Sequence, residues 1–158
     1  MSIKKQIRTT FAVVLLALLA TGVAQAAGLS QREASVLSVV NEVRAGHGLR
    51  PLAVDTRLVR VARSYSATLL RTNVFTHGAM DQRLRRSGAR GPRFGENLAW
   101  GVGRRASAAV IVRSWLASPG HRANLLYPGY RRIGIGALTG RFAGYRGATV
   151  VTVDFAGR

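Results

Sequence analysis

The sequence contains no cysteine among its 158 residues. Disulfide frameworks, thiolate metal sites and cysteine nucleophiles are therefore excluded, and any site must use imidazole, carboxylate, hydroxyl or backbone groups. Acidic residues are also few, since six Asp and Glu stand against 24 Lys and Arg. The formal net charge is +18, yet 47% of the residues are hydrophobic, which argues against disorder and is enough apolar side chain for one folded domain.

The N-terminal residues have the three parts of a secretory signal peptide. Three basic residues precede an apolar run over residues 11–20, and small residues with an A-x-A pattern follow it. We predict a signal peptide over residues 1–26, cleaved after Ala26, and a secreted or periplasmic protein. Cleavage removes three cations and lowers the formal charge from +18 to +15. An uncleaved anchor over the same segment is the alternative.

Helices are predicted in the first two thirds of the mature chain. Ser30 to Glu33 is a capping box followed by apolar residues at helical spacing, which predicts a helix over residues 31–45. Asp55 is predicted to cap a second helix that continues to Arg71. A third helix fits residues 106–117, where apolar residues again recur at helical spacing.

The last third of the chain changes to the period of β-strands. Residues 133–138 alternate between apolar residues and glycine, and residues 148–155 form a β-rich run. A further short strand is predicted over residues 97–100. Because helices precede most strands without a regular βαβ alternation, the fold class is α+β, with an antiparallel sheet covered by helices.

The three histidines and a single glutamate are the candidate functional residues. His47 lies between two glycines after the first helix, where we expect an exposed loop. His77 and His121 each adjoin a glycine, and Glu96 is followed by Asn97. No two of them have the local spacing of a metal-binding motif, so each taken singly is more readily explained as a hydrogen-bonded structural residue.

Several segments in order resemble the CAP superfamily of cysteine-rich secretory, antigen 5 and pathogenesis-related 1 proteins, in its short bacterial SCP-like form. The matching segments are Asn41 to Arg44, Gly48-Leu49-Arg50-Pro51-Leu52, His77, Gly95-Glu96-Asn97-Leu98-Ala99, Trp115 to Leu126 including Ser118-Pro119-Gly120-His121, and Gly134-Ile135-Gly136. The resemblance covers residues 34–155. It implies a CAP domain over residues 30–157, folded as an α-β-α sandwich with a central antiparallel sheet.

The resemblance also implies a cleft in which His77, Glu96 and His121 meet, with Ser118 beside them. Many eukaryotic members carry a second glutamate three residues after the helix tryptophan, but Ser118 holds that position here, which weakens any mechanism that needs a paired acid and base. From their chemistry, two imidazoles and a carboxylate can act as ligands of zinc or another divalent metal, as catalytic proton-transfer groups, or as binders of an anionic or hydroxyl-bearing ligand.

Three functions from different classes remain open. The first is a non-catalytic exported module whose cleft binds a small molecule, a lipid or a cell-envelope component, with or without a metal. The second is a metal- or Glu96-dependent hydrolase of peptide or cell-wall substrates; a serine hydrolase built on Ser118 and His121 would lack the G-x-S-x-G elbow. The third is a basic envelope protein that binds anionic polymers through an arginine patch, formed by Arg83, Arg85, Arg86 and Arg90.

The expected partners are correspondingly few. No recognised nucleic-acid fold is present, so we expect no specific nucleic-acid partner, and no cofactor other than the divalent metal is implied. We expect contact with a membrane only through the signal peptide, and a monomeric protein.

Overall fold

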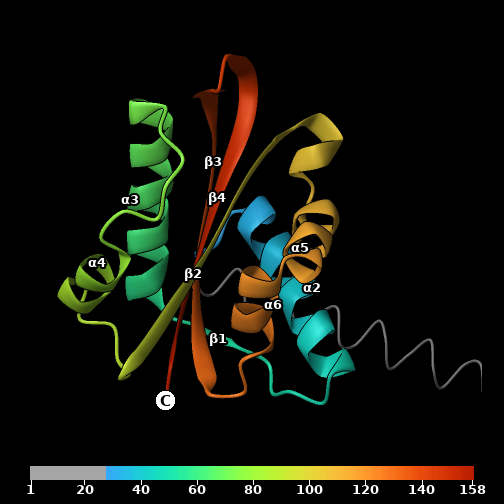
Figure 1. Cartoon of the computed structure of the whole chain (residues 1–158), viewed down its shortest axis with the longest axis vertical. Helices are drawn as coiled ribbons and strands as arrows, with labels where there is room; N and C mark the ends of the chain where they lie inside the picture. The colour runs from blue at the N-terminus through green and yellow to red at the C-terminus, as the bar shows by residue number, and fades with distance from the viewer. Residues whose placement is uncertain (1–27) are drawn as a thin grey trace, which may run out of the picture.

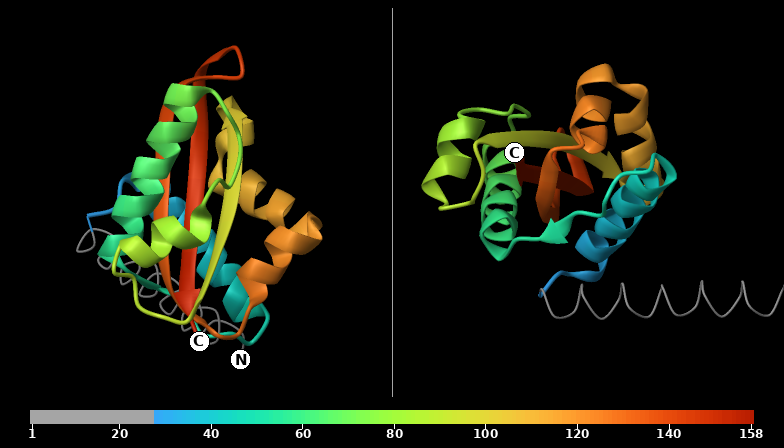
Figure 2. Two further views of the ribbon diagram at one scale, coloured as in Figure 1. Left: turned by 60° about the vertical axis from the view of Figure 1, so that its left-hand side comes forward. Right: turned by 90° about the horizontal axis from the view of Figure 1, so that it is seen from below.

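A four-stranded sheet lies between two layers of helices in the computed structural model, which describes residues 28–158 (Figure 1). Helices α2 (Gln31–Gly46), α5 (Ala108–Ala117) and α6 (Pro119–Leu126) cover one face. Helices α3 (Thr56–Thr72) and α4 (Met80–Arg86) cover the other, as the view from below in Figure 2 also shows. The predicted α-β-α sandwich is therefore confirmed.

The sheet consists of β1 (Ala53–Val54), β2 (Arg93–Val102), β3 (Tyr130–Phe142) and β4 (Tyr145–Gly157), in the spatial order β1-β3-β4-β2. The three long strands pair antiparallel, as predicted, whereas the two residues of β1 pair parallel with β3 and make the sheet mixed. All three long strands extend beyond the predicted ranges. Strand β2 forms one edge of the sheet, and the candidate site is built along it.

The first two helices begin where their capping residues predict. The Ser30 hydroxyl accepts from the Glu33 N–H, and the Glu33 carboxylate accepts from the Ser30 N–H at 2.8 Å. The Asp55 carboxylate accepts from the Arg57 N–H at the start of α3. Glu33 also accepts from Arg63 Nε at 2.8 Å, so the residue that caps α2 ties this helix to α3.

The third predicted helix differs from the observed structure. Its first residue belongs to a 3₁₀ turn, η1 (Gly103–Ala106), and α5 begins only at Ala108. Pro119 then starts α6 as its first helical residue, a position where proline needs no hydrogen-bond donor. His121 consequently lies in the first turn of a new helix and not at the end of the third one. The short helix α4 was not predicted.

The glycines of β3 explain how closely α3 approaches the sheet. Ile133 and Ile135 pack into the core beneath α2 and α5, while the alternating Gly134 and Gly136 face α3. A Cβ atom at Gly136 would overlap the backbone of Ala62 in α3. Because this face of β3 carries no side chains there, α3 lies directly against β3 and also packs on β4. No helix within residues 28–158 is long and apolar enough to span a membrane.

Candidate functional site

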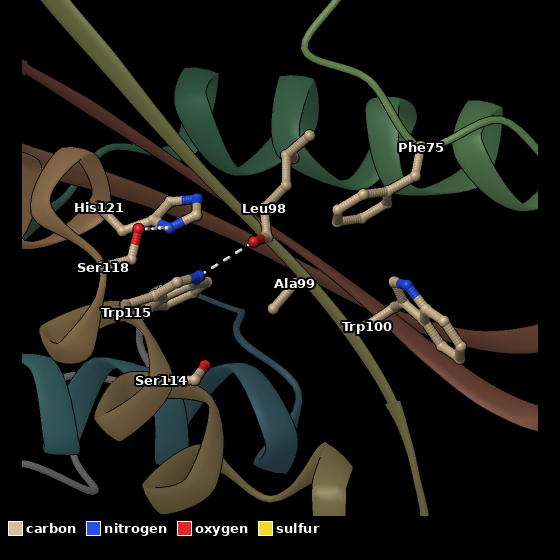
Figure 3. A pocket seen from close by; sticks show the side chains of 8 residues that line it. All are labelled: Phe75, Leu98, Ala99, Trp100, Ser114, Trp115, Ser118 and His121. Atoms are coloured by element: carbon tan, nitrogen blue, oxygen red, sulfur yellow. Dashed lines mark hydrogen bonds between the residues drawn. The ribbon is translucent and has the colours of Figure 1, made fainter.

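The candidate site follows the free edge of β2, where α5 and α6 approach it. The indole Nε1 of Trp115 donates to the Leu98 carbonyl at 2.9 Å (Figure 3). Asn124 Nδ2 donates to the Glu96 carbonyl at 3.1 Å. These side chains satisfy edge carbonyls that would otherwise be open to another strand. They also fix the two helices beside β2.

Glu96 projects from β2 on the α3 side of the sheet and is enclosed by an imidazole and a guanidinium. Its side chain is fully buried. One carboxylate oxygen lies 2.8 Å from Nδ1 of His77, and the other pairs with the guanidinium of Arg83. Arg83 also lies over the ring of Tyr65, 3.4 Å from its centroid, and donates to the His77 carbonyl at 3.2 Å. Glu96 therefore anchors His77, whose own side chain is half exposed.

A second carboxyl group, which the sequence analysis missed, lies beside Glu96. Asp154 on β4 is the register partner of Glu96 on β2 and is completely buried. Neither of its carboxylate oxygens has a hydrogen-bond partner within residues 28–158. Burial, and then the negative charge of Glu96, raise the pKa of Asp154 well above its usual value. Because Glu96 is paired with the guanidinium of Arg83 and Asp154 has no such partner within residues 28–158, we infer that the pair holds one proton on Asp154.

His121 lies on the opposite side of β2, at the start of α6. Its Nδ1 is 3.0 Å from the hydroxyl of Ser118, and its carbonyl accepts from Asn97 Nδ2 at 3.0 Å. Burial, and then the charge on His77, lower the pKa of His121. The neutral imidazole is thus favoured at neutral pH. No hydrogen bond within residues 28–158 joins His121 to His77 or Glu96, since the two imidazoles have different partners.

A hollow of about 340 Å³ opens beside this edge, within the range of small-molecule pockets (Figure 3). Its walls are mainly aromatic and apolar, with two hydroxyl groups and an imidazole as polar groups; the lining residues are Phe75, Leu98, Ala99, Trp100, Ser114, Trp115, Ser118 and His121. None of these side chains is a carboxylate. The arrangement suits a ligand with an apolar or aromatic body and a hydroxyl or anionic group.

Fewer side chains are available as metal ligands than the sequence predicted. Within the described part of the chain, no three His, Asp or Glu side chains lie close enough to hold a metal ion. Both carboxylate oxygens of Glu96 are engaged by His77 and Arg83, so Glu96 is not a free ligand. The two imidazoles each use Nδ1 in a hydrogen bond, to Glu96 and to Ser118, which leaves Nε2 for a ligand. A carboxylate behind a histidine is the usual support of a metal-binding imidazole.

The remaining candidates are placed apart from this cleft or differently from expectation. His47 is exposed at the end of α2, with Nδ1 2.8 Å from the Val43 carbonyl. Arg85, Arg86 and Arg90 are exposed, but Arg83 turns inward to Glu96. The predicted arginine patch is therefore wrong for Arg83, because its guanidinium pairs with the buried carboxylate of Glu96.

Comparison with known proteins identifies related sequences. A model of the cysteine-rich secretory protein family (CAP) matches residues 37–155. The uncharacterised protein YkwD of Bacillus subtilis is 32% identical over 113 residues, which are 68% of this chain and 43% of YkwD. The uncharacterised membrane protein YlbC of the same organism is 31% identical over 109 residues, which are 66% of this chain and 31% of YlbC. The chain spans less than half the length of either relative.

Solved structures are similar as well. An extracellular protein containing an SCP domain from Bacillus anthracis is 27% identical, with a TM-score of 0.64 over 78% of this chain and 39% of that chain. An outer surface protein of Borrelia burgdorferi is 25% identical, with a TM-score of 0.67 over 78% of this chain and 90% of that chain.

Proposed function

The chain belongs to the cysteine-rich secretory protein (CAP) family, and on this premise we propose that it is an exported, non-catalytic module whose cleft binds a small ligand or a cell-surface component. The signal-peptide pattern of residues 1–26 supports export, as does the extracellular description of the Bacillus anthracis relative.

The observation that carries the binding function is the composition of the pocket beside β2. Its aromatic walls can cover the apolar part of a ligand, while Ser118 and His121 offer hydrogen bonds at one end. Glu96 is enclosed by His77 and Arg83, so it can influence a ligand only through His77. A group that acts as acid or base must reach the reacting atom directly or through one water, which favours binding over hydrolysis.

Filling the pocket should remove the ligand. Ser114 lines the pocket and is exposed, so Ser114→Trp is expected to occupy the hollow without disturbing the core. Native mass spectrometry of the protein purified from its host should detect a bound small molecule on the wild type and not on this variant. Ser64→Trp, at an exposed position of α3 outside the pocket, is the matched control and should retain the molecule. Equal occupancy in the wild type and both variants, or no small molecule on any of them, would contradict the proposal.

Zinc is the proposed metal for the two imidazoles, and its binding should be weak and pH-dependent. A proton competes with zinc for each imidazole, and a histidine of ordinary pKa, about 6.5, binds about tenfold more weakly at one pH unit below that value. The lowered pKa of His121 keeps this ligand neutral to more acidic pH. Calorimetry should therefore show at least about tenfold weaker binding at pH 5.5 than at pH 7.5.

The zinc prediction has a direct control in the same chain. Replacing His77 and His121 together by Ala should abolish the heat of binding, whereas His47→Ala, outside the cleft, should leave it unchanged. The same heat in the double variant as in the wild type would rule out the cleft as the zinc site.

A further inference from the structure

Exposed aromatic and apolar side chains gather at one end of the molecule. Val74, Phe75, Trp100 and Tyr145 are between 36% and 56% exposed. They come from the loop after α3, from β2 and from the start of β4. Figures 1 and 2 show these segments together at the end where the β3–β4 hairpin protrudes. We call these four residues, with Phe142, the aromatic tip.

The rings of the aromatic tip are joined by direct contacts, with Phe142, only 3% exposed, packed beneath Phe75 and Trp100. Phe142 lies edge-on to Phe75 and Trp100, with ring centroids 6.0 and 5.4 Å apart, and Trp100 lies 5.9 Å from Tyr145. Such contacts fix the rings in place before anything binds. A contiguous exposed apolar surface marks an interaction site more often than scattered apolar residues do.

The same segments carry positive charge and no negative charge. Residues 71–75, 100–105 and 141–146 contain no Asp or Glu. Five exposed arginines belong to them: Arg71, Arg104, Arg105, Arg141 and Arg146. Aromatic rings flanked by cations match the boundary of an anionic lipid bilayer, where Trp and Tyr lie at the headgroups and Lys and Arg are attracted to the surface.

We propose that the aromatic tip docks this domain on the surface of an anionic lipid bilayer. The rings enter the headgroup region, and the arginines of the three segments face lipid phosphates. A soluble polyanion would engage the arginines alone and would leave the apolar rings in water. The proposal goes beyond ligand binding in the cleft and beyond a membrane contact through the signal peptide. Since Phe75 and Trp100 also line the pocket, docking would bring the pocket mouth to the membrane.

Trp100 provides a direct readout of docking. The chain has two tryptophans, and Trp115 is only 1% exposed, so a change of emission on contact with lipid reports Trp100. The chain lacking residues 1–26 should sediment with phosphatidylcholine vesicles that contain about one third phosphatidylglycerol, and its tryptophan emission should move to shorter wavelength. Vesicles of phosphatidylcholine alone should bind it at least about tenfold more weakly.

Two sets of variants separate docking at the tip from attraction by net charge. Replacing Arg104, Arg105 and Arg146 together by Ser should weaken vesicle binding at least about tenfold, since each cation near an anionic surface contributes roughly a factor of five before screening by salt. The matched control replaces three exposed arginines outside the tip by Ser and should lower binding less than about threefold; these are Arg85, Arg86 and Arg90.

The aromatic contribution is tested by replacing Phe75 and Tyr145 by Ser, which should abolish the emission shift. Circular dichroism confirms that each variant is folded. Equal losses in the two arginine triples would show attraction by net charge only and would overturn the proposal. Vesicle binding without a change in tryptophan emission, vesicle binding unaffected by the aromatic double variant, or no binding to anionic vesicles would also overturn it.

Discussion

Asp154→Asn is expected to stabilise the protein at pH 8 and to have little effect at pH 4. The unfolded chain releases the Asp154 proton near its ordinary pKa, whereas burial and Glu96 raise the pKa of this carboxyl in the folded state. Between the two pKa values the folded state binds the extra proton, so the wild type loses stability as pH rises. Asparagine has nearly the same shape as the aspartic acid side chain and cannot ionise. The gain in unfolding free energy at pH 8 should be at least about 1 kcal/mol, because each unit by which the folded pKa exceeds the unfolded one contributes about 1.4 kcal/mol.

Urea unfolding at pH 4, 6 and 8 measures this effect, and the informative quantity is the difference between variant and wild type at each pH. Other carboxyl groups titrate equally in both proteins and cancel in the difference. Asp81→Asn, at an exposed position of α4, is the control and should give a difference below about 0.5 kcal/mol at every pH. A difference for Asp154→Asn that stays constant from pH 4 to pH 8 would show that Asp154 is not the group that holds the proton.

The parts of the fold that the sequence predicted well depend on residues close together in the chain. The capping box at Ser30 and the cap at Asp55 act within three residues, so both helix starts could be identified without tertiary structure. The alternation of glycine and isoleucine over residues 133–136 likewise identified a strand. The same alternation also indicates a close neighbour, because glycines on one face of a strand allow another element to approach closely.

The errors concern features that tertiary contacts decide. Helix α4 has one buried residue, Leu84, in seven, so it has no apolar stripe that a pattern could identify. Pro119 gave a signal, since proline favours the first turn of a helix, but the third helix was predicted over residues 106–117 and no new helix was predicted after it. The parallel pairing of β1 involves only two residues and has no sequence signature.

The candidate site likewise contains residues that the sequence could identify and residues whose role only tertiary contacts determine. His77, Glu96 and His121 were selected because family motifs carry them, and two of the three are in direct contact. The partners that decide the charge of the site, Arg83 and Asp154, depend on the packing of α4 and on the register of β2 with β4. Asp154 did leave a signal, since a single carboxyl within the apolar run of residues 148–155 must be buried with a neighbour or be protonated.

Arg83→Met is expected to destabilise the protein more than loss of any exposed arginine does. Arg83 is the cation paired with the buried carboxylate of Glu96, next to the buried Asp154, and it also covers the ring of Tyr65. Without it, a negative charge remains in the interior with only His77 beside it. Breaking a buried ion pair by removing one partner costs about 3–5 kcal/mol, and the lower end applies because the Arg83 side chain is partly exposed. Urea unfolding at pH 8 should therefore show a loss of about 3 kcal/mol.

Two further variants distinguish this role from that of a surface cation. Arg85→Met removes an exposed arginine from the same helix and should cost less than about 1 kcal/mol, the usual value of an exposed charge. Glu96→Gln combined with Arg83→Met removes the uncompensated charge and should recover part of the loss, because the energy resides in the pair and not in either residue alone. If Arg83→Met costs no more than Arg85→Met, then Arg83 belongs with the exposed arginines of the predicted patch. The buried carboxyl pair would then be neutralised by protons alone, and the stability of the wild type would fall more steeply with rising pH.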